Sequence, residues 1–177
     1  MFFALFPPLA YLALGLLSPD AHAGKLAEGF RGKAFAPIAA ENFPKPADTC
    51  RAGDRKDVIW SCDYAIGDVP VTVHYAYNSG IFWGYTVFAD APTTADSYNV
   101  CSTLLTVYDA AYGAGKPLNK YQTARLDQKY WTDGAVYATF NYNEIAGWCE
   151  LLVFDTSLFD LVKRIAKDEA GKAVGDL

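Results

Sequence analysis

Four cysteines, Cys50, Cys62, Cys101 and Cys149, constrain the fold of this chain more than any other feature. An even number of cysteines in an exported protein indicates disulfide bonds, and four cysteines allow three pairings. We favour Cys50–Cys62, which closes a short polar loop, and Cys101–Cys149, which would join a helix to a strand. The alternative is a zinc site, but the sequence has no C-x-x-C motif and offers few histidines, so we expect no metal.

Export is predicted by the amino-terminal segment. Residues Phe2 to Leu17 are almost continuously apolar, and Ala21-His22-Ala23 is a small-x-small sequence of the kind that signal peptidases cleave. We therefore expect a signal peptide over residues 1–23 and a periplasmic or extracellular protein. The segment departs from the usual pattern because no Lys or Arg precedes the apolar run. A membrane anchor is the alternative, although Pro7 and Pro8 and the short length of the run argue against it.

The charge balance excludes some classes of partner. The chain has 15 Lys and Arg against 20 Asp and Glu, for a formal net charge of −5. Binding to nucleic acid or to anionic lipid needs clustered basic residues, so neither is expected. No second long apolar stretch follows the leader, so we expect no membrane insertion once the leader is removed.

Strands and helices follow each other in the same order in both halves of the chain. Alternating apolar residues predict strands, tight turns separate them, and an apolar stripe that begins at Cys101 predicts a helix after Pro92–Asp96. A final helix is expected to begin at a cap on Thr156 or Ser157. The predicted strands are Val58–Ile66, Val69–Tyr77, Ile81–Ala89, Tyr121–Tyr130, Ala135–Tyr142 and Trp148–Phe154.

This order predicts an α+β fold in which an antiparallel sheet carries its helices on one face. The order is also that of a tandem βββα-βββα repeat with halves 50–117 and 118–167, although the local sequence match is short and chance similarity stays open. The remaining divisions are an amino-terminal arm over 24–49, a single domain over 50–167 and a flexible tail over 168–177.

The catalytic inventory is small. His74 is the only histidine outside the leader, and no nucleophile, metal-hydrolase or nucleotide-binding motif is present. We therefore expect no cofactor and favour a protein that is not an enzyme. A small hydrolase that uses His74 and a nearby carboxylate is kept as an alternative.

Aromatic residues near the predicted hairpin turns point to binding instead. Exposed Tyr and Trp side chains are common at the centres of protein interfaces. We predict a non-catalytic binding protein, of the inhibitor or immunity type, that occludes another macromolecule, for which a protein is expected, with Phe82 and Trp83 as anchors and Glu144 or Asp133 reaching basic groups of that partner. The predicted binding residues are Tyr77, Asn78, Phe82, Trp83, Tyr142, Glu144 and Trp148. The alternative is a small apolar or carbohydrate ligand held on an aromatic sheet face, with Trp60, Tyr75, Trp131 or Tyr137 lining the pocket.

Overall fold

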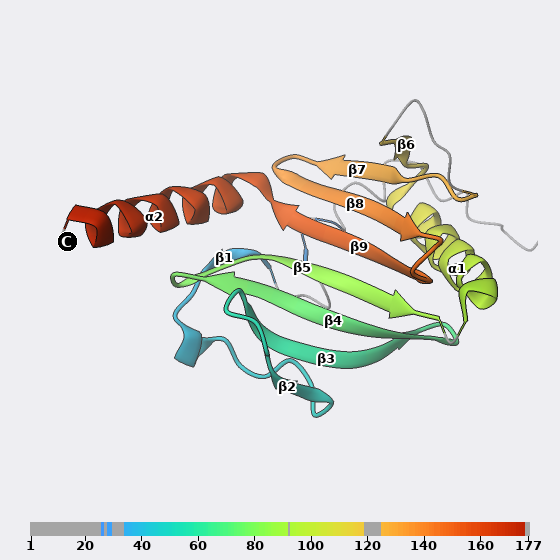
Figure 1. Ribbon diagram of the computed structural model, residues 1–177, viewed down its shortest axis with the longest axis horizontal. Helices are drawn as coiled ribbons and strands as arrows, with labels where there is room; N and C mark the ends of the chain where they lie inside the picture. Colours follow the sequence, from blue (N-terminus) through green and yellow to red (C-terminus); the bar gives the residue numbers. More distant parts are fainter. Residues whose placement is uncertain (1–25, 27, 30–33, 92, 119–124, 176–177) are drawn as a thin grey trace, which may run out of the picture.

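The computed structural model describes residues 26, 28–29, 34–91, 93–118 and 125–175, and the expected signal peptide lies outside them (Figure 1). The elements, in chain order, are β1 (Ala36–Pro37), a 3-10 turn (Ala40–Asn42), β2 (Cys50–Ala52), β3 (Val58–Ile66), β4 (Val69–Asn78), β5 (Ile81–Asp90), α1 (Thr94–Tyr112), β6 (Lys116–Pro117), β7 (Lys129–Asp133), β8 (Val136–Asn143), β9 (Trp148–Asp155) and α2 (Thr156–Gly175).

The strands form one nine-stranded sheet in the order β2-β3-β4-β5-β9-β8-β7-β6, with β1 added on β5. The pairings between neighbouring strands are antiparallel, which confirms the predicted α+β class. The strands of each half form a hairpin series, and the last strands of the two series, β5 and β9, pair at the centre of the sheet. This arrangement does not confirm the tandem repeat.

One face of the sheet carries the hydrophobic core. Alternate residues of β9, Cys149, Leu151 and Val153, are buried on this face, and Tyr85 and Val87 of β5 lie beside them. Helix α1 covers this face, and the Cys101–Cys149 disulfide bonds the helix to β9. The second disulfide joins Cys50 to Cys62, so the two expected disulfides are present. The segment that begins at Cys50 was expected to be a loop, but Cys50 lies in β2 and is the cross-strand neighbour of Cys62 in β3.

The segment before β2 covers another part of the same face. The Phe43 ring lies 4.9 Å from the Phe82 ring and 6.1 Å from the Tyr75 ring, and Phe35 stacks on Tyr85 at 5.9 Å. We call the face covered by α1 and by this segment the core face, and the opposite one the open face.

Helix α2 does not lie on the core face, which corrects the expectation that both helices share one face. Its Phe159 ring packs against Trp83 of β5 and Phe154 of β9, at centroid distances of 4.9 and 5.3 Å. Phe154 follows the core residue Val153, so alternation along β9 places it on the open face. In Figure 1 the helix continues from the end of β9 and projects past the strands.

The element boundaries differ from the predicted ones at several places. The Asp155 carboxylate accepts hydrogen bonds from the N–H groups of Ser157 and Leu158, so this side chain caps α2 instead of Thr156 or Ser157. Helix α2 continues to Gly175, into the segment expected to form a tail. The strand expected over Tyr121–Tyr130 begins at Lys129, and residues 119–124 of that range lie outside the described residues. Among the described residues, no helix is both long and apolar enough to span a membrane.

Candidate functional site

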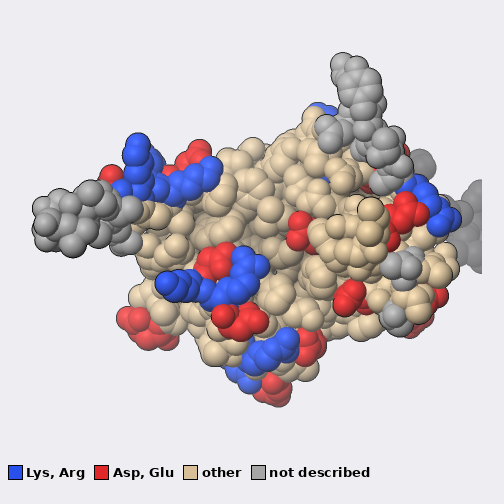
Figure 2. All heavy atoms as spheres, viewed as in Figure 1, with Lys and Arg blue, Asp and Glu red and all other residues tan. Residues whose placement is uncertain are grey.

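The open face presents straight rows of side chains that run across the sheet. Thr72, Phe88, Glu150 and Asn141 are successive cross-strand neighbours on β4, β5, β9 and β8. The adjacent row is His74, Thr86, Leu152 and Thr139. Figure 2 shows this side of the molecule as a mostly uncharged surface with scattered charged side chains.

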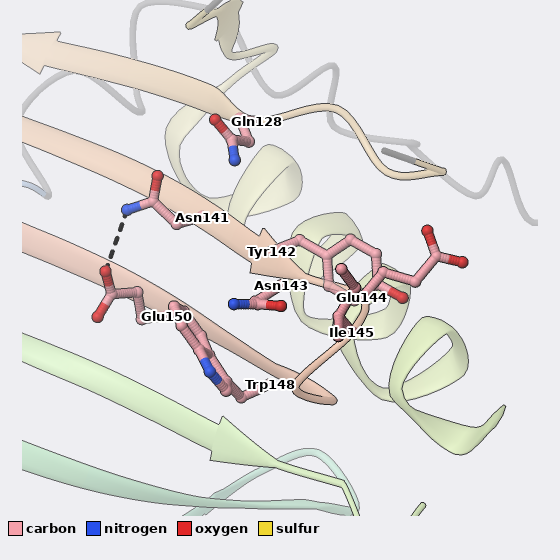
Figure 3. Close-up of a pocket in the computed structure, with 8 residues that line it drawn as sticks. All are labelled: Gln128, Asn141, Tyr142, Asn143, Glu144, Ile145, Trp148 and Glu150. Atoms are coloured by element: carbon pink, nitrogen blue, oxygen red, sulfur yellow. Dashed lines mark hydrogen bonds between the residues drawn. The ribbon is translucent and has the colours of Figure 1, made fainter. Parts of the chain in front are cut away.

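A pocket of about 550 Å³ lies at the end of this face where β8 turns into β9. The lining residues are Gln128, Asn141, Tyr142, Asn143, Glu144, Ile145, Trp148 and Glu150. Asn141 Nδ2 donates a hydrogen bond of 3.1 Å to Glu150 Oε1, and both side chains project from their strands beside Trp148 (Figure 3). The Trp148 ring also lies 5.8 Å from the Phe88 ring. Aromatic rings, amides and a carboxylate therefore meet in one depression.

A second pocket of about 450 Å³ continues from the first, because Glu150 lines both. Its floor includes His74, Thr86, Phe88 and Leu152, and Arg55 and Asp57 contribute to its lining. The two pockets together form a groove on the open face, which we call the Glu150 groove.

His74 is held in this groove by a buried hydroxyl group. His74 Nδ1 and Ser61 Oγ are joined by a hydrogen bond of 2.9 Å, and Ser61 is only 2% exposed. Partial burial lowers the pKa of the imidazole, and the nearby Arg55 guanidinium lowers it further. Since the Ser61 hydroxyl is buried, the pair does not present an attacking oxygen to a substrate, so the geometry gives the hydrolase alternative no nucleophile at this position.

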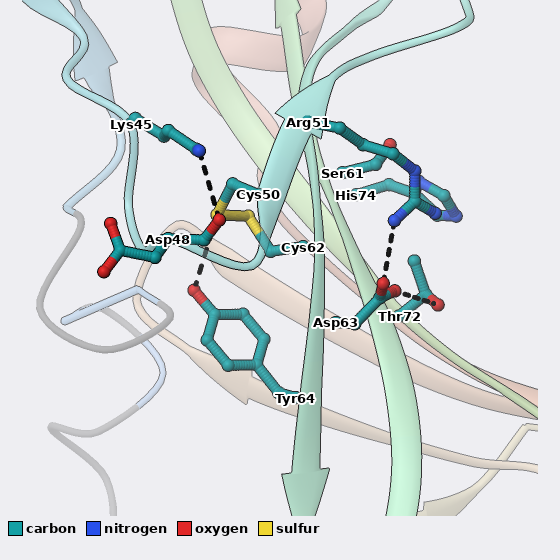
Figure 4. A network of polar contacts seen from close by, with 10 residues as sticks. All are labelled: Lys45, Asp48, Cys50, Arg51, Ser61, Cys62, Asp63, Tyr64, Thr72 and His74. Atoms are coloured by element: carbon teal, nitrogen blue, oxygen red, sulfur yellow. Dashed lines mark hydrogen bonds and ion pairs between the residues drawn. A yellow bond between two sulfur atoms is a disulfide. The ribbon is translucent and has the colours of Figure 1, made fainter.

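A polar network borders His74 at the edge of the sheet. Arg51 Nη1 forms an ion pair of 2.8 Å with Asp63 Oδ2, and Thr72 donates a hydrogen bond to the other carboxylate oxygen (Figure 4). The Cys50–Cys62 disulfide lies on the opposite side of β3 from Asp63 and fixes β2 beside β3. The Arg51 guanidinium therefore neutralises the charge of Asp63, which distinguishes this carboxylate from Glu150.

The carboxylates around the open face differ in whether a cation neutralises them. Asp57 is paired with Arg55 at 2.8 Å, and Glu144 with Arg125 at 3.6 Å. Glu150 forms no ion pair within the part of the chain that the structure describes, and the hydrogen bond that it accepts from Asn141 comes from a neutral amide. The groove therefore has a half-buried negative charge at its centre.

Some predicted binding residues lie in the interior, contrary to expectation. Phe82 is 0% exposed because Phe35, Phe43 and Tyr75 pack around its ring, so it is not an anchor for a partner. Tyr142 is buried, with its hydroxyl bonded to Ser97.

Other predicted residues serve the structure or lie at the surface. Tyr77 donates its hydroxyl to the Ile38 carbonyl, and Asn78 accepts from Ser79 at the turn. Trp83 lines the second pocket, but its Nε1 is buried under α2 and has no hydrogen-bond partner among the described residues. Glu144 and Trp148 line the first pocket.

The predicted binding residues flank two hairpin turns, one between β4 and β5 and one between β8 and β9, and these turns lie at opposite ends of the sheet. Asp90, at the far end of β5 from the Ile81 turn, is the residue that pairs with Trp148. The length of β5 separates the two turns, which is about 30 Å for a strand of this size. A single small partner surface would not contact both turns.

The residues proposed for a sugar pocket are also dispersed. Tyr75 and Trp131 are buried on the core face, and Trp60 donates its indole N–H to the Phe43 carbonyl. Tyr137 stacks on Tyr130 at 5.5 Å.

The residues of the Glu150 groove that are absent from the predicted binding set include Thr86, Phe88, Asn141, Glu150 and Leu152. One signal was available, because Glu150 alternates with the core residues Cys149 and Leu151 and therefore faces away from them. The partners from β5 and β8 follow only from the strand order.

Comparisons with protein-family models, with curated proteins and with solved structures found no match to this chain. Within the described residues, no three His, Cys, Asp or Glu side chains are grouped as metal ligands.

Proposed function

We propose that this chain is an exported binding protein that occludes a partner protein with the open face of its sheet, in the manner of an inhibitor or immunity protein. The Glu150 groove is the observation that carries the proposal, because it places aromatic, amide and acidic side chains together on the open face, beyond the end where α2 packs on Trp83.

The dimensions of the open face support a protein as the occupant. The face, including the end that lies under α2, is about 30 Å along the strands and about 24 Å from β3 to β7, or on the order of 700 Å². This area is close to the ~800 Å² that each partner contributes to a stable protein interface. A small ligand would need only one of the two pockets.

Exposed apolar surface beside the groove supports the same occupant. Ile145, in the turn between β8 and β9, is 92% exposed and also lines the first pocket. A protein partner would bury this side chain together with the Trp148 ring, and large aromatic residues are common at the centres of such interfaces.

The surroundings of the groove are suited to rigid docking. Both disulfides lie in the sheet or tie α1 to it, and the central groove residues Phe88, Asn141 and Glu150 project from strands. Preformed surfaces lose less conformational entropy on binding. Two disulfides also favour an oxidising compartment, which agrees with the proposed export.

A carbohydrate is the second candidate ligand, favoured by the composition of the first pocket. Trp148 lies beside Asn141, Asn143 and Glu150, and sugars combine apolar ring faces with many hydrogen-bonding hydroxyl groups. This candidate uses one pocket, so it would cover less of the exposed Ile145 side chain than a protein would.

Site-specific photo-cross-linking in cells that make the protein tests the proposal. Benzoylphenylalanine would replace Thr86 or Thr139 on the open face, and Val107, on the exposed side of α1, would be the control position. We expect both open-face positions to give an adduct with the same protein, and Val107 to give none. No protein adduct from the open face, or an adduct from Val107 alone, would contradict the proposal. Thr86→Arg should then weaken the purified complex at least tenfold.

A further inference from the structure

We propose that the Glu150 groove receives an arginine side chain of the partner protein, with the guanidinium group bound to Glu150 and stacked against Phe88 and Trp148. This inference rests on the proposed function and adds the chemical group that the partner must present.

The centre of the groove carries the negative charge of Glu150. Glu150 is half-buried, and its neighbours in the row are Phe88 and Asn141, neither of which carries a charge. A carboxylate accepts about four hydrogen bonds, and Asn141 donates one at 3.1 Å. A cationic donor from outside would supply both the missing charge and the missing hydrogen bonds.

Two aromatic rings, those of Phe88 and Trp148, lie beside that carboxylate. Phe88 lies directly opposite Glu150 on β5, and Trp148 lies two residues before it on the same face of β9. The two rings are 5.8 Å apart and tilted by 38°. Cations bind to the faces of such rings, and Trp and Phe beside a carboxylate form a site for an organic cation.

The shape of the site favours arginine over lysine. A guanidinium group is planar, so it stacks on an aromatic face while its N–H groups make paired hydrogen bonds to a carboxylate. An ammonium group is a compact point charge, so it gains less binding energy from contact with a flat aromatic face. The pocket of about 550 Å³ has room for the guanidinium group and its aliphatic stem.

The exposed side chain at the rim indicates that the arginine belongs to a protein. Ile145 lines the same pocket as Glu150 and is 92% exposed. A free amino acid would leave this residue in water, whereas a polypeptide that carries the arginine would cover it.

Titrations followed by NMR would test the arginine site directly. The disulfide-bonded protein at 0.15 M salt would be titrated with acetyl-Gly-Arg-Gly-amide, and with the same peptide carrying lysine or citrulline in place of arginine. We expect saturable shifts of the Trp148 indole N–H and the Asn141 side-chain amide with the arginine peptide. Citrulline, which has nearly the same shape without the charge, should bind at least tenfold more weakly, and lysine several-fold more weakly.

Two variants assign the effect to the proposed residues. Glu150→Gln keeps the size of the side chain and should weaken arginine binding at least tenfold, and Phe88→Leu should weaken it several-fold. Asp68→Asn is the matched control because it removes the same charge from an exposed turn, and it should leave binding within twofold. The spectra of each variant also report whether it is folded.

The inference is overturned if the arginine peptide gives no saturable shift, if citrulline or lysine binds equally well, or if Glu150→Gln retains binding. It is also overturned if maltotriose shifts the same signals and the arginine peptide does not, since the pocket would then be a sugar site. Its failure is separable from that of the proposed function. A partner that cross-links to the open face but binds the Glu150→Gln protein with unchanged affinity retains the function and excludes the arginine site.

Discussion

Phe88 of β5 and Glu150 of β9 lie directly opposite each other across the ladder that joins the two halves of the sheet. Each residue belongs to a different hairpin series, so neither half of the chain contains this pair alone. Strand pairing places the aromatic ring beside the carboxylate without any loop, and the Asn141 amide then fixes the carboxylate from the other side. The groove is therefore a consequence of the central β5–β9 pairing, and changes to that pairing should disturb it.

Removal of the Cys101–Cys149 disulfide should destabilise the protein strongly. Replacing both residues with Ala opens a loop with a sequence separation of 48, and the chain-entropy model gives about 4 kcal/mol for a loop of this length. Replacing Cys50 and Cys62, with a separation of 12, should cost about 3 kcal/mol. Urea unfolding followed by tryptophan fluorescence measures both losses, and a loss below about 1 kcal/mol for the longer loop would contradict the prediction.

Gly84 should be difficult to replace, because it lies where β5 and β9 approach each other closely. A Cβ atom at this position would meet the Val153 carbonyl oxygen at 2.7 Å and Phe154 Cβ at 3.0 Å. Gly84→Ala forces the central strands apart and should lower the free energy of unfolding by about 1–3 kcal/mol. Thr139→Ala, on the neighbouring central strand β8, is the control and should change it by less than about 1 kcal/mol.

The side of the sheet on which each residue lies was predictable from the sequence, and the position of each strand within the sheet was not. Alternation along β9 separates Cys149 and Leu151 from Glu150, because side chains of a strand point to opposite faces in turn. That rule needs only local sequence. The β5–β9 pairing depends on contacts between distant segments, which local sequence does not reveal. The predicted binding surface therefore combined two hairpin turns that lie at opposite ends of the sheet.

The misassignment of Phe82 has a related cause. This residue follows a predicted turn, where exposure is usual, but the segment around Phe35 and Phe43 folds back over it. That segment has only scattered apolar residues and no clear period, so its docking site was not readable from the sequence. Helix α2 was likewise expected on the core face because an apolar stripe shows that a helix packs but not where it packs.

The stability of the protein should decrease as the pH falls below about 6.5 because of His74. Partial burial and Arg55 lower its pKa below the ordinary value of 6.5, while Asp54 and Asp63 oppose the shift. Between the lowered pKa and 6.5, the unfolded chain binds more protons than the folded one, so the free energy of unfolding falls as the pH drops. Above pH 6.5 the imidazole is neutral in both states, so His74 causes no loss of stability there.

His74→Gln isolates this effect, since glutamine can still form a hydrogen bond with Ser61 and does not titrate. The free energy of unfolding, measured in urea at intervals from pH 8 to pH 5, should fall less steeply for this variant than for the wild-type protein. If the free energy of unfolding fell equally steeply for both proteins, the pKa of His74 would be the same in the folded and unfolded states, and the prediction would be wrong.

Phe82→Ala should disrupt the fold and not merely a binding surface. The side chain is 0% exposed and contacts the rings of Phe35, Phe43 and Tyr75. Loss of a fully buried phenylalanine leaves a cavity and typically costs about 3–5 kcal/mol. Thermal and urea unfolding of the variant should show a loss of this size.

Ile145→Ala is the matched control, because it truncates an apolar residue in the other hairpin turn. Ile145 is 92% exposed, so its truncation should change the free energy of unfolding by less than about 0.5 kcal/mol. Partner binding should separate the two variants differently from stability. Ile145→Ala should weaken the complex while the protein stays folded. Phe82→Ala should act on the complex only to the extent that it unfolds the chain. A stable Phe82→Ala protein that no longer binds the partner would instead restore Phe82 as an anchor.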